Sequence, residues 1–151
     1  MKQTLLSLSN LSKQFDGKTV LDSLDLEILD GEFITLLGPS GCGKTTLGKA
    51  IIQLIQATAG NINYHLDQDD QQTLKQICRY IQFIFQDPFS CLNPRMMVCD
   101  ILTEGLLAYY PKLTQIEKLN RAGELLAQVG LPSNSLYRYP HEFSGGQRQR
   151  L

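Results

Sequence analysis

The order of apolar and polar positions predicts strands early in the chain and a helix after them. Residues 5–11 alternate, and residues 20–29 set leucine and isoleucine against aspartate and glutamate, as half-buried strands do. Residues 33–37 form a short apolar run that predicts a buried strand. Residues 44–56 then carry apolar side chains at helical spacing. The first third of the chain therefore predicts three strands followed by a helix.

The pattern changes near the middle of the chain. Residues 61–66 and 80–85 predict two more strands, and the polar residues 67–72 between them predict an exposed loop. After two closely spaced prolines, residues 98–106 carry a helical stripe of apolar side chains. A second stripe, over residues 114–129, opens on a capping-box sequence and ends before a glycine and a proline. The last third of the chain is therefore predicted to be helical.

One stretch between the third predicted strand and the first predicted helix carries specific chemistry. It runs Gly38-Pro39-Ser40-Gly41-Cys42-Gly43-Lys44-Thr45-Thr46 and fits the phosphate-binding pattern G-x-x-x-x-G-K-[ST]. Its glycines let backbone amides approach an anion as a nest at a helix N-terminus. In such a P-loop Lys44 would reach the β- and γ-phosphates of ATP, and the Thr45 hydroxyl would bind Mg²⁺. A chance glycine turn is the plain alternative, and the strand–loop–helix context favours the nucleotide site.

Composition narrows the function classes. With 151 residues the chain is one domain or less. Its net charge is −1, so the chain lacks the excess of positive charge that is typical of a nucleic-acid-binding protein. No apolar run reaches membrane-spanning length, and the N-terminus lacks the apolar core of an export signal. The 4 cysteines have neither paired metal spacing nor a secreted disulfide framework, which predicts free thiols in the reducing cytosol.

Two further motifs follow the P-loop. Gln86 comes directly after the apolar run at residues 80–85 and precedes a loop stiffened by prolines. This position suits a switch contact. Ser144-Gly145-Gly146-Gln147 comes near the end, and by itself it also fits a serine-capped helix start. In this order the three motifs resemble those of the ATP-binding subunits of ABC transporters. By that resemblance Gln86 is similar to the Q-loop glutamine, residues 144–147 to the signature motif, and Phe15 to the aromatic that stacks on adenine.

The resemblance implies an α/β fold, a P-loop NTPase core with an antiparallel β part at its N-terminus. It places a nucleotide-binding core with P-loop and Q-loop over residues 1–95, and a helical subdomain ending in the signature over residues 96–151. Lys44 and Gln86 would act in catalysis, with Gln86 orienting water and Mg²⁺. ATP would lie between this domain and a second ABC ATPase domain, identical or different. Membrane permease subunits would be further partners, on the cytoplasmic face of the cell membrane.

Within the family, the chain resembles the importers of dipeptides, oligopeptides and nickel. The likeness rests on Gln86-Asp87-Pro88-Phe89-Ser90, on Leu92-Asn93-Pro94-Arg95 and on the run from Tyr139 to Arg150, and it is greatest to the microcin C and oligopeptide type. Family members continue beyond the signature to an Asp-Glu pair and a switch histidine, which residues 1–151 do not reach. We therefore expect an incomplete domain that binds ATP better than it hydrolyses it.

Two other functions fit the same motifs. One is a nucleotide-binding fragment without turnover, which an ATPase assay set against a binding assay would distinguish. The other is a non-transport ABC protein acting in translation or repair. The net charge of −1 weighs against that nucleic-acid-linked class. Co-purification with membrane permeases would separate it from an importer subunit.

Overall fold

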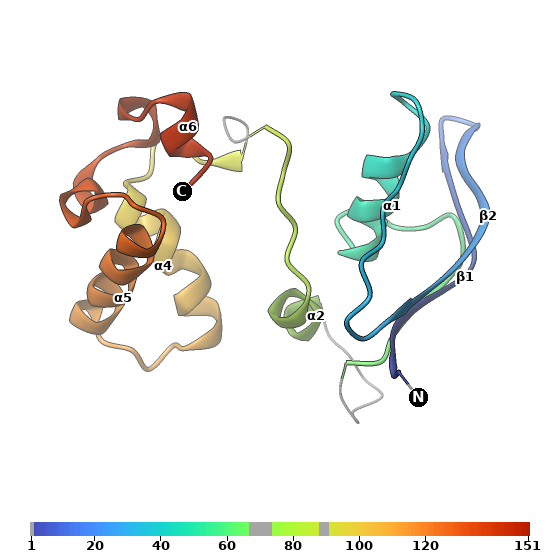
Figure 1. Cartoon of the computed structure of the whole chain (residues 1–151), viewed down its shortest axis with the longest axis horizontal. Coiled ribbons are helices and arrows are strands. Elements are labelled where there is room, and N and C mark those ends of the chain that lie inside the picture. Colours follow the sequence, from blue (N-terminus) through green and yellow to red (C-terminus); the bar gives the residue numbers. More distant parts are fainter. Residues whose placement is uncertain (1, 67–73, 88–90) are drawn as a thin grey trace. The chain divides into compact units, whose positions relative to one another are not determined.

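The chain forms two compact units. The structure is a computed structural model that describes residues 2–66, 74–87 and 91–151. The first unit spans Met1–Ile84 and the second spans Phe85–Leu151 (Figure 1). The loop predicted over residues 67–72 lies outside the described residues, as do residues 88–90 of the proline-stiffened loop.

The first unit is built on a three-stranded antiparallel sheet. Its strands are β1 (Thr4–Phe15), β2 (Lys18–Leu29) and β3 (Ala59–Tyr64), in the order β2-β1-β3. Asp16 and Gly17 join β1 to β2 with positive φ angles of 48° and 78°, the conformation that a two-residue hairpin turn requires. The strands predicted over residues 5–11, 20–29 and 61–66 are therefore confirmed, with shifted ends.

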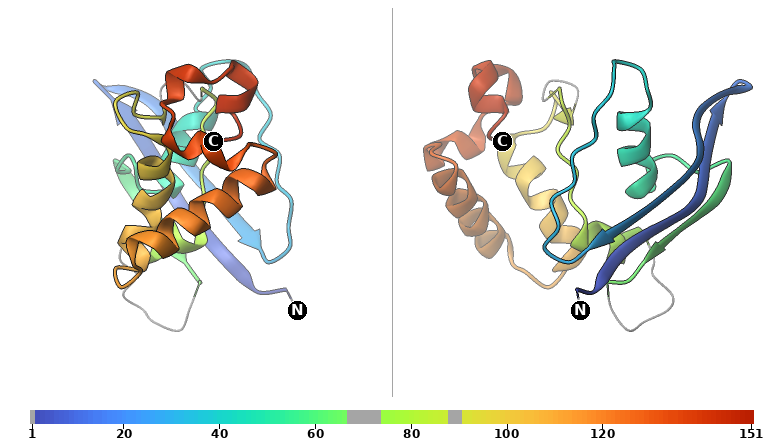
Figure 2. Two further views of the ribbon diagram at one scale, coloured as in Figure 1. Left: turned by 90° about the vertical axis from the view of Figure 1, so that its left-hand side faces the viewer. Right: turned by 45° about the vertical axis from the view of Figure 1, so that its right-hand side comes forward.

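Helix α1 (Lys44–Ile51) packs on one face of this sheet, as Figure 2 shows. Side chains alternate between the two faces of a strand, so Leu6 and Leu8 share the face toward the helix, and a register shift between Leu8 and Leu11 brings Leu11 into the same cluster. Leucines from β1 and β2 meet the apolar side of α1 in a buried cluster: Leu6, Leu8, Leu11, Leu21, Leu47 and Ala50. Each buried leucine contributes about 1.5–3 kcal/mol, which fixes α1 and the loop before it against the sheet.

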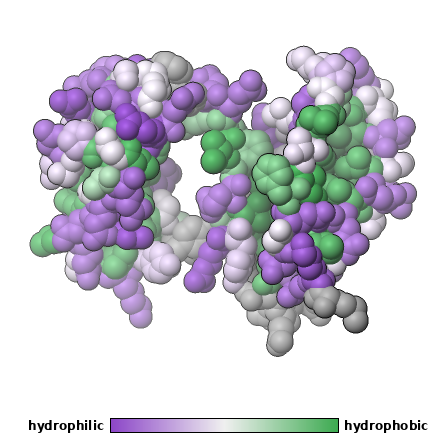
Figure 3. Space-filling view, in the orientation of Figure 1, coloured by the Kyte–Doolittle hydropathy of each residue, from purple (hydrophilic) through white to green (hydrophobic). Residues whose placement is uncertain are grey.

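Two predicted strands are absent from the described part of the chain. Residues 33–37 and residues 81–85 are not paired as strands, and a short helix, α2 (Leu74–Tyr80), precedes the second run. Phe33 is 93% exposed and Ile84 is 94% exposed. The prediction of buried strands was wrong here. An apolar run shows that a segment favours burial, but a strand also needs a neighbouring strand to which it can hydrogen-bond. Figure 3 shows apolar side chains at the surface of the first unit.

The second unit is helical, as predicted. Helices α4 (Val98–Tyr109) and α5 (Gln115–Gln128) pack side by side, and two 3-10 turns, Ser133–Tyr137 and Pro140–Glu142, lead to the short α6 (Gly145–Arg148). Its core gathers buried side chains from α4, from α5, from the first 3-10 turn and from the connections beside them: Val98, Cys99, Ala122, Leu126, Leu131, Leu136 and Phe143.

The start of α5 follows the prediction closely. The Thr114 hydroxyl accepts a hydrogen bond from the Glu117 amide, and the Glu117 carboxylate accepts one from the Thr114 amide at 2.7 Å. These two bonds satisfy backbone donors that a helix N-terminus otherwise leaves unpaired. The hydrogen bonds from Thr114 lower the pKa of Glu117, because they favour its charged form.

Candidate nucleotide site

The conformation of the loop before α1 depends on Gly43. Gly43 is the N-cap of the helix, and its φ of 96° lies in the left-handed region that favours glycine. A Cβ at this position would lie 2.9 Å from the Val20 carbonyl oxygen and 3.0 Å from a methyl group of Leu21. The loop therefore comes closer to β2 here than any residue with a side chain allows.

The Lys44 ammonium is folded over its own loop. Its Nζ donates hydrogen bonds to the Gly38 carbonyl at 2.8 Å and the Pro39 carbonyl at 2.7 Å, and it lies 3.4 Å from the Cys42 Sγ. A Cβ at Gly38 would be 2.7 Å from the same sulfur, so the Cys42 side chain would have to shift to make room for it. The positive charge is therefore held at the centre of the loop.

This arrangement has the properties of an anion site. Within the described residues, no side chain caps the N-terminus of α1 and its first turn holds no acidic residue. The first amides of a helix then point outward unpaired, with the positive end of the helix dipole behind them. Ser40, Gly41 and Thr45 are exposed, and the position of a Cβ at Gly41 is open space, while Thr46 is half-buried on the first turn of α1. Phosphate oxygens match this set of donors.

Phe15 is carried toward the loop by the β1–β2 hairpin. It ends β1 opposite Lys18, and the residue is 43% exposed. A register shift beside the turn leaves Val20 as the extra residue of a bulge in β2, and Val20 is the residue that meets Gly43. Lys18 and Val20 are two residues apart, roughly 7 Å along a strand. The ring thus lies at the end of the hairpin that contacts the loop.

One charged group beside Phe15 was not predicted from the sequence. The Lys13 Nζ lies 4.7 Å from the centroid of the Phe15 ring, within the range of a cation–π contact. The contact follows from the extension of β1 to Phe15, because residues two apart on a strand share a face.

Tyr64 ties β3 to the far end of α1. Its hydroxyl donates to the Ile51 carbonyl at 2.6 Å, and the Gln53 side chain donates to the same hydroxyl at 3.4 Å. Burial raises the pKa of Tyr64, which keeps the hydroxyl protonated and able to donate. The sheet therefore holds α1 at its C-terminal end as well as at its loop.

The sequence from Ser144 to Gln147 forms a capped helix start in the second unit. The Ser144 hydroxyl accepts from the Gln147 amide at 3.3 Å, and the Gln147 side chain accepts from the Ser144 amide at 2.9 Å. Ser144, Gly145 and Gly146 are exposed, and a Cβ at Gly146 would meet nothing within 4 Å. Both glycines therefore leave the start of α6 open to an approaching group.

Two arginines anchor this short helix. Arg148 donates from Nε to the Phe143 carbonyl at 3.0 Å. Arg150 donates from Nη1 to the Val129 carbonyl at 3.0 Å, at the C-terminal end of α5, and from Nε to the Gly146 carbonyl at 3.4 Å. A guanidinium at a helix C-terminus is favoured by the helix dipole. Sequence analysis did not predict these contacts.

Gln86 belongs to the second unit, directly after Phe85, and its side chain is exposed. Of the predicted site residues, the first unit therefore carries Phe15 and the P-loop, and the second unit carries Gln86 and residues 144–147.

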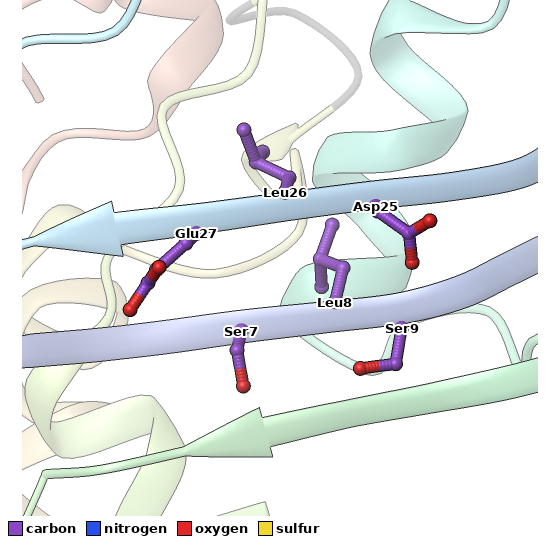
Figure 4. A pocket seen from close by; sticks show the side chains of 6 residues that line it. All are labelled: Ser7, Leu8, Ser9, Asp25, Leu26 and Glu27. Carbon is purple, nitrogen blue, oxygen red and sulfur yellow. The ribbon is translucent and has the colours of Figure 1, made fainter.

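A shallow depression on the sheet has a different character. It is lined by Ser7, Leu8, Ser9, Asp25, Leu26 and Glu27 (Figure 4). The serines and carboxylates alternate with leucines that face α1, so they lie on the opposite face of the sheet. Asp25 already accepts a hydrogen bond from the Asn10 amide at 2.7 Å, and Glu27 accepts one from Thr4. This surface is a polar sheet face with its own internal contacts.

The sequence model described as ABC transporter matches residues 21–151, which include the P-loop, Gln86 and residues 144–147. The chain belongs to the ABC transporter family.

Curated ABC relatives match nearly the whole chain. The oligopeptide transport ATP-binding protein OppF of Bacillus subtilis is 42% identical over 159 residues, covering 100% of this chain and 52% of its own length. A peptide import ATP-binding protein of Brucella ovis is 44% identical, covering 97% of this chain and 48% of its own length. The chain therefore spans about half the length of the curated relatives it matches.

Solved ABC structures have the same fold. The ATP-binding cassette MJ0796, in a dimeric structure described as bound to ADP and Pi, matches with a TM-score of 0.78 at 26% identity, over 97% of this chain and 66% of that one. The cbiO1 subunit of Clostridium perfringens matches with a TM-score of 0.71 at 25% identity, over 99% of this chain and 59% of that one. In the part of this ABC chain that the structure describes, no helix is long and apolar enough to cross a membrane.

Proposed function

We propose that this chain binds Mg-ATP and forms the N-terminal portion of the ATP-binding subunit of an ABC importer for peptides or related solutes. The observation that carries the proposal is the P-loop. There the Lys44 ammonium is held by two loop carbonyls beside the uncapped N-terminus of α1. Membership of the ABC transporter family and the likeness to OppF of Bacillus subtilis support the choice of transport class.

Each residue of the loop has a role in this proposal. Lys44 contacts the β- and γ-phosphates, and the backbone amides of residues 40–46 surround the phosphate chain. The exposed Thr45 hydroxyl binds Mg²⁺, with Gln86 as a further oxygen ligand that also orients water. Mg²⁺ needs few protein ligands beside phosphate oxygens and water. This fits a chain whose described residues hold no group of three or more His, Cys, Asp or Glu side chains that could bind a metal.

Residues 144–147 serve a second ATPase domain in this proposal. The Ser144 hydroxyl and the amides at the start of α6 face the γ-phosphate of the nucleotide that the partner domain binds. The exposed, side-chain-free surface at Gly145 and Gly146 supports that use. The dimeric structure of the similar cassette MJ0796 supports, by analogy, the pairing with a second ATPase domain. The assembled pair binds membrane permease subunits at the cytoplasmic face of the membrane, and peptides or related solutes are the cargo.

Nucleotide binding by the 151-residue chain tests the proposal. We expect Lys44→Ala to weaken Mg-ATP binding at least tenfold in titration calorimetry, because a charge-assisted hydrogen bond contributes about 1.5–3 kcal/mol. Lys49→Ala is the matched control, since Lys49 lies in the last turn of the same helix. A folded Lys44→Ala chain that binds ATP as tightly as the Lys49→Ala chain would refute the P-loop assignment.

The transport class has its own test. A tagged OppF-type subunit that carries residues 1–151 of this chain is expected to co-purify with permease subunits of a peptide importer from solubilised membranes. Recovery with ribosomes or DNA instead would favour the non-transport class. ATP binding without any ATPase activity in such an assembly would favour a nucleotide-binding protein without turnover.

A further inference from the structure

A lysine beside Phe15 has no role in the motifs considered so far. Lys13 and Phe15 lie two residues apart on β1, and the Lys13 Nζ lies 4.7 Å from the centroid of the ring. A cation above a ring is attracted to its negative face, so this contact restrains the ring and covers one of its two faces. Phe15 is still 43% exposed, so aromatic surface remains open to a flat ligand.

The hairpin turn fixes where that open surface lies. The Asp16–Gly17 turn has two positive φ angles, which allows only a tight connection and sets Phe15 directly opposite Lys18. Two residues beyond Lys18, the bulge at Val20 brings the hairpin against Gly43 of the P-loop. A nucleotide whose base stacks on Phe15 would therefore have its phosphates near the P-loop, which contacts the same hairpin.

We propose that Lys13 is a positioning residue of the nucleotide site: its ammonium holds the Phe15 ring so that the opposite face of the ring receives the adenine base. The inference rests on the proposed function, and it adds a residue that governs how the base, rather than the phosphate chain, is bound. A ring that keeps one orientation loses less freedom when the base stacks on it, so the stack forms at lower ligand concentration.

Lys13 could also act as a plain positive charge near a polyphosphate. The two roles differ in what they require of the ligand, because stacking needs a base and charge attraction does not. Comparing Mg-ATP with magnesium tripolyphosphate, which carries phosphates and no base, separates them. Lys18 provides the matched control. It lies opposite Phe15 across the turn and carries the same charge, whereas it is the Lys13 ammonium that lies over the ring.

The experiment measures both dissociation constants by titration calorimetry for the 151-residue chain and its variants. We expect Lys13→Gln to weaken Mg-ATP binding about two- to fivefold relative to tripolyphosphate, the factor that a cation–π contact of this kind supplies. Lys18→Gln should leave the ratio of the two constants unchanged. Lys13→Arg should restore it, because a guanidinium also binds an aromatic face. In a Phe15→Ala background, Lys13→Gln should have no further effect on the ratio.

Two outcomes would overturn the inference. If the chain binds Mg-ATP and Lys13→Gln weakens ATP and tripolyphosphate equally, as Lys18→Gln does, then Lys13 acts only as a charge and the inference fails alone. If the parent chain binds neither ligand, the proposed nucleotide site fails and the inference fails with it. Circular dichroism of each variant checks that the hairpin is folded, so that a lost β1–β2 pairing is not mistaken for a lost stack.

Discussion

The contact between the P-loop and β2 makes a sharp prediction for Gly43→Ala. At a φ of 96° an alanine is in the left-handed region, which costs about 1–2 kcal/mol for a residue with a Cβ. The new Cβ would also lie 2.9 Å from the Val20 carbonyl oxygen, which is backbone and cannot rotate away. Forcing a methyl group into packed surroundings costs about a further 1–3 kcal/mol. We therefore expect Gly43→Ala to destabilise the first unit by about 2–5 kcal/mol.

Gly41→Ala is the control that isolates the contact. Gly41 has a similar φ of 82°, but a Cβ there would meet nothing within 4 Å. Both substitutions reduce the freedom of the unfolded chain equally, so this effect cancels when the two are compared. The difference between them is then the cost of the collision with Val20, about 1–3 kcal/mol.

Urea denaturation followed by circular dichroism measures that difference. With a slope of about 1–3 kcal/mol per molar urea, the Gly43→Ala midpoint should fall about 1 M below the Gly41→Ala midpoint. Equal midpoints for the two variants would refute the reasoning, because they would mean that the loop does not approach β2 at Gly43. A lower midpoint for Gly41→Ala would contradict it more strongly.

Two further predictions concern the second unit. Arg150→Ala should lower its unfolding free energy by about 1 kcal/mol, because the guanidinium donates to the Val129 carbonyl at the end of α5; an unchanged urea midpoint would contradict this. Glu117 has a lowered pKa because of its bonds to Thr114, so its contribution is complete above its unfolded pKa and disappears as the pH falls through the lower folded pKa. Glu117→Gln should therefore make the unfolding free energy depend less on pH in that acidic window. A variant whose unfolding free energy falls with acid in parallel with that of the parent would argue against this role.

The sequence predicted those parts of the fold that are decided within a few residues. The capping box at Thr114 and the capped start at Ser144 each involve side chains three residues apart, and both formed as expected. The P-loop helix formed from Lys44, although it ends at Ile51 rather than near residue 56. The β1–β2 hairpin was predictable for the same reason, because its turn is specified by Asp16 and Gly17.

The sequence did not predict features that depend on distant partners. The runs at residues 33–37 and 81–85 are apolar enough for a buried sheet, yet a strand is defined by hydrogen bonds to a neighbour that the run itself does not specify. The contact of Arg150 with Val129 joins residues 21 positions apart, and nothing in either local pattern predicts it. Lys13 was missed for another reason: a single lysine on a strand is ordinarily a solvated residue, and only the position of the ring gave it a partner.

The geometry of Lys44 explains why the P-loop keeps its shape although the apolar run before it is exposed. Two loop carbonyls hold the ammonium, and Gly43 holds the other end of the loop against β2. A lysine side chain loses up to about 2 kcal/mol of rotamer freedom when it is fixed, and here folding has already imposed that loss. A phosphate would offer charged acceptors in place of two neutral carbonyls, which makes the exchange favourable without ordering the side chain again. The same residue thus organises the loop and prepares it for an anion, so the sequence motif predicts the shape of the site as well as its chemistry.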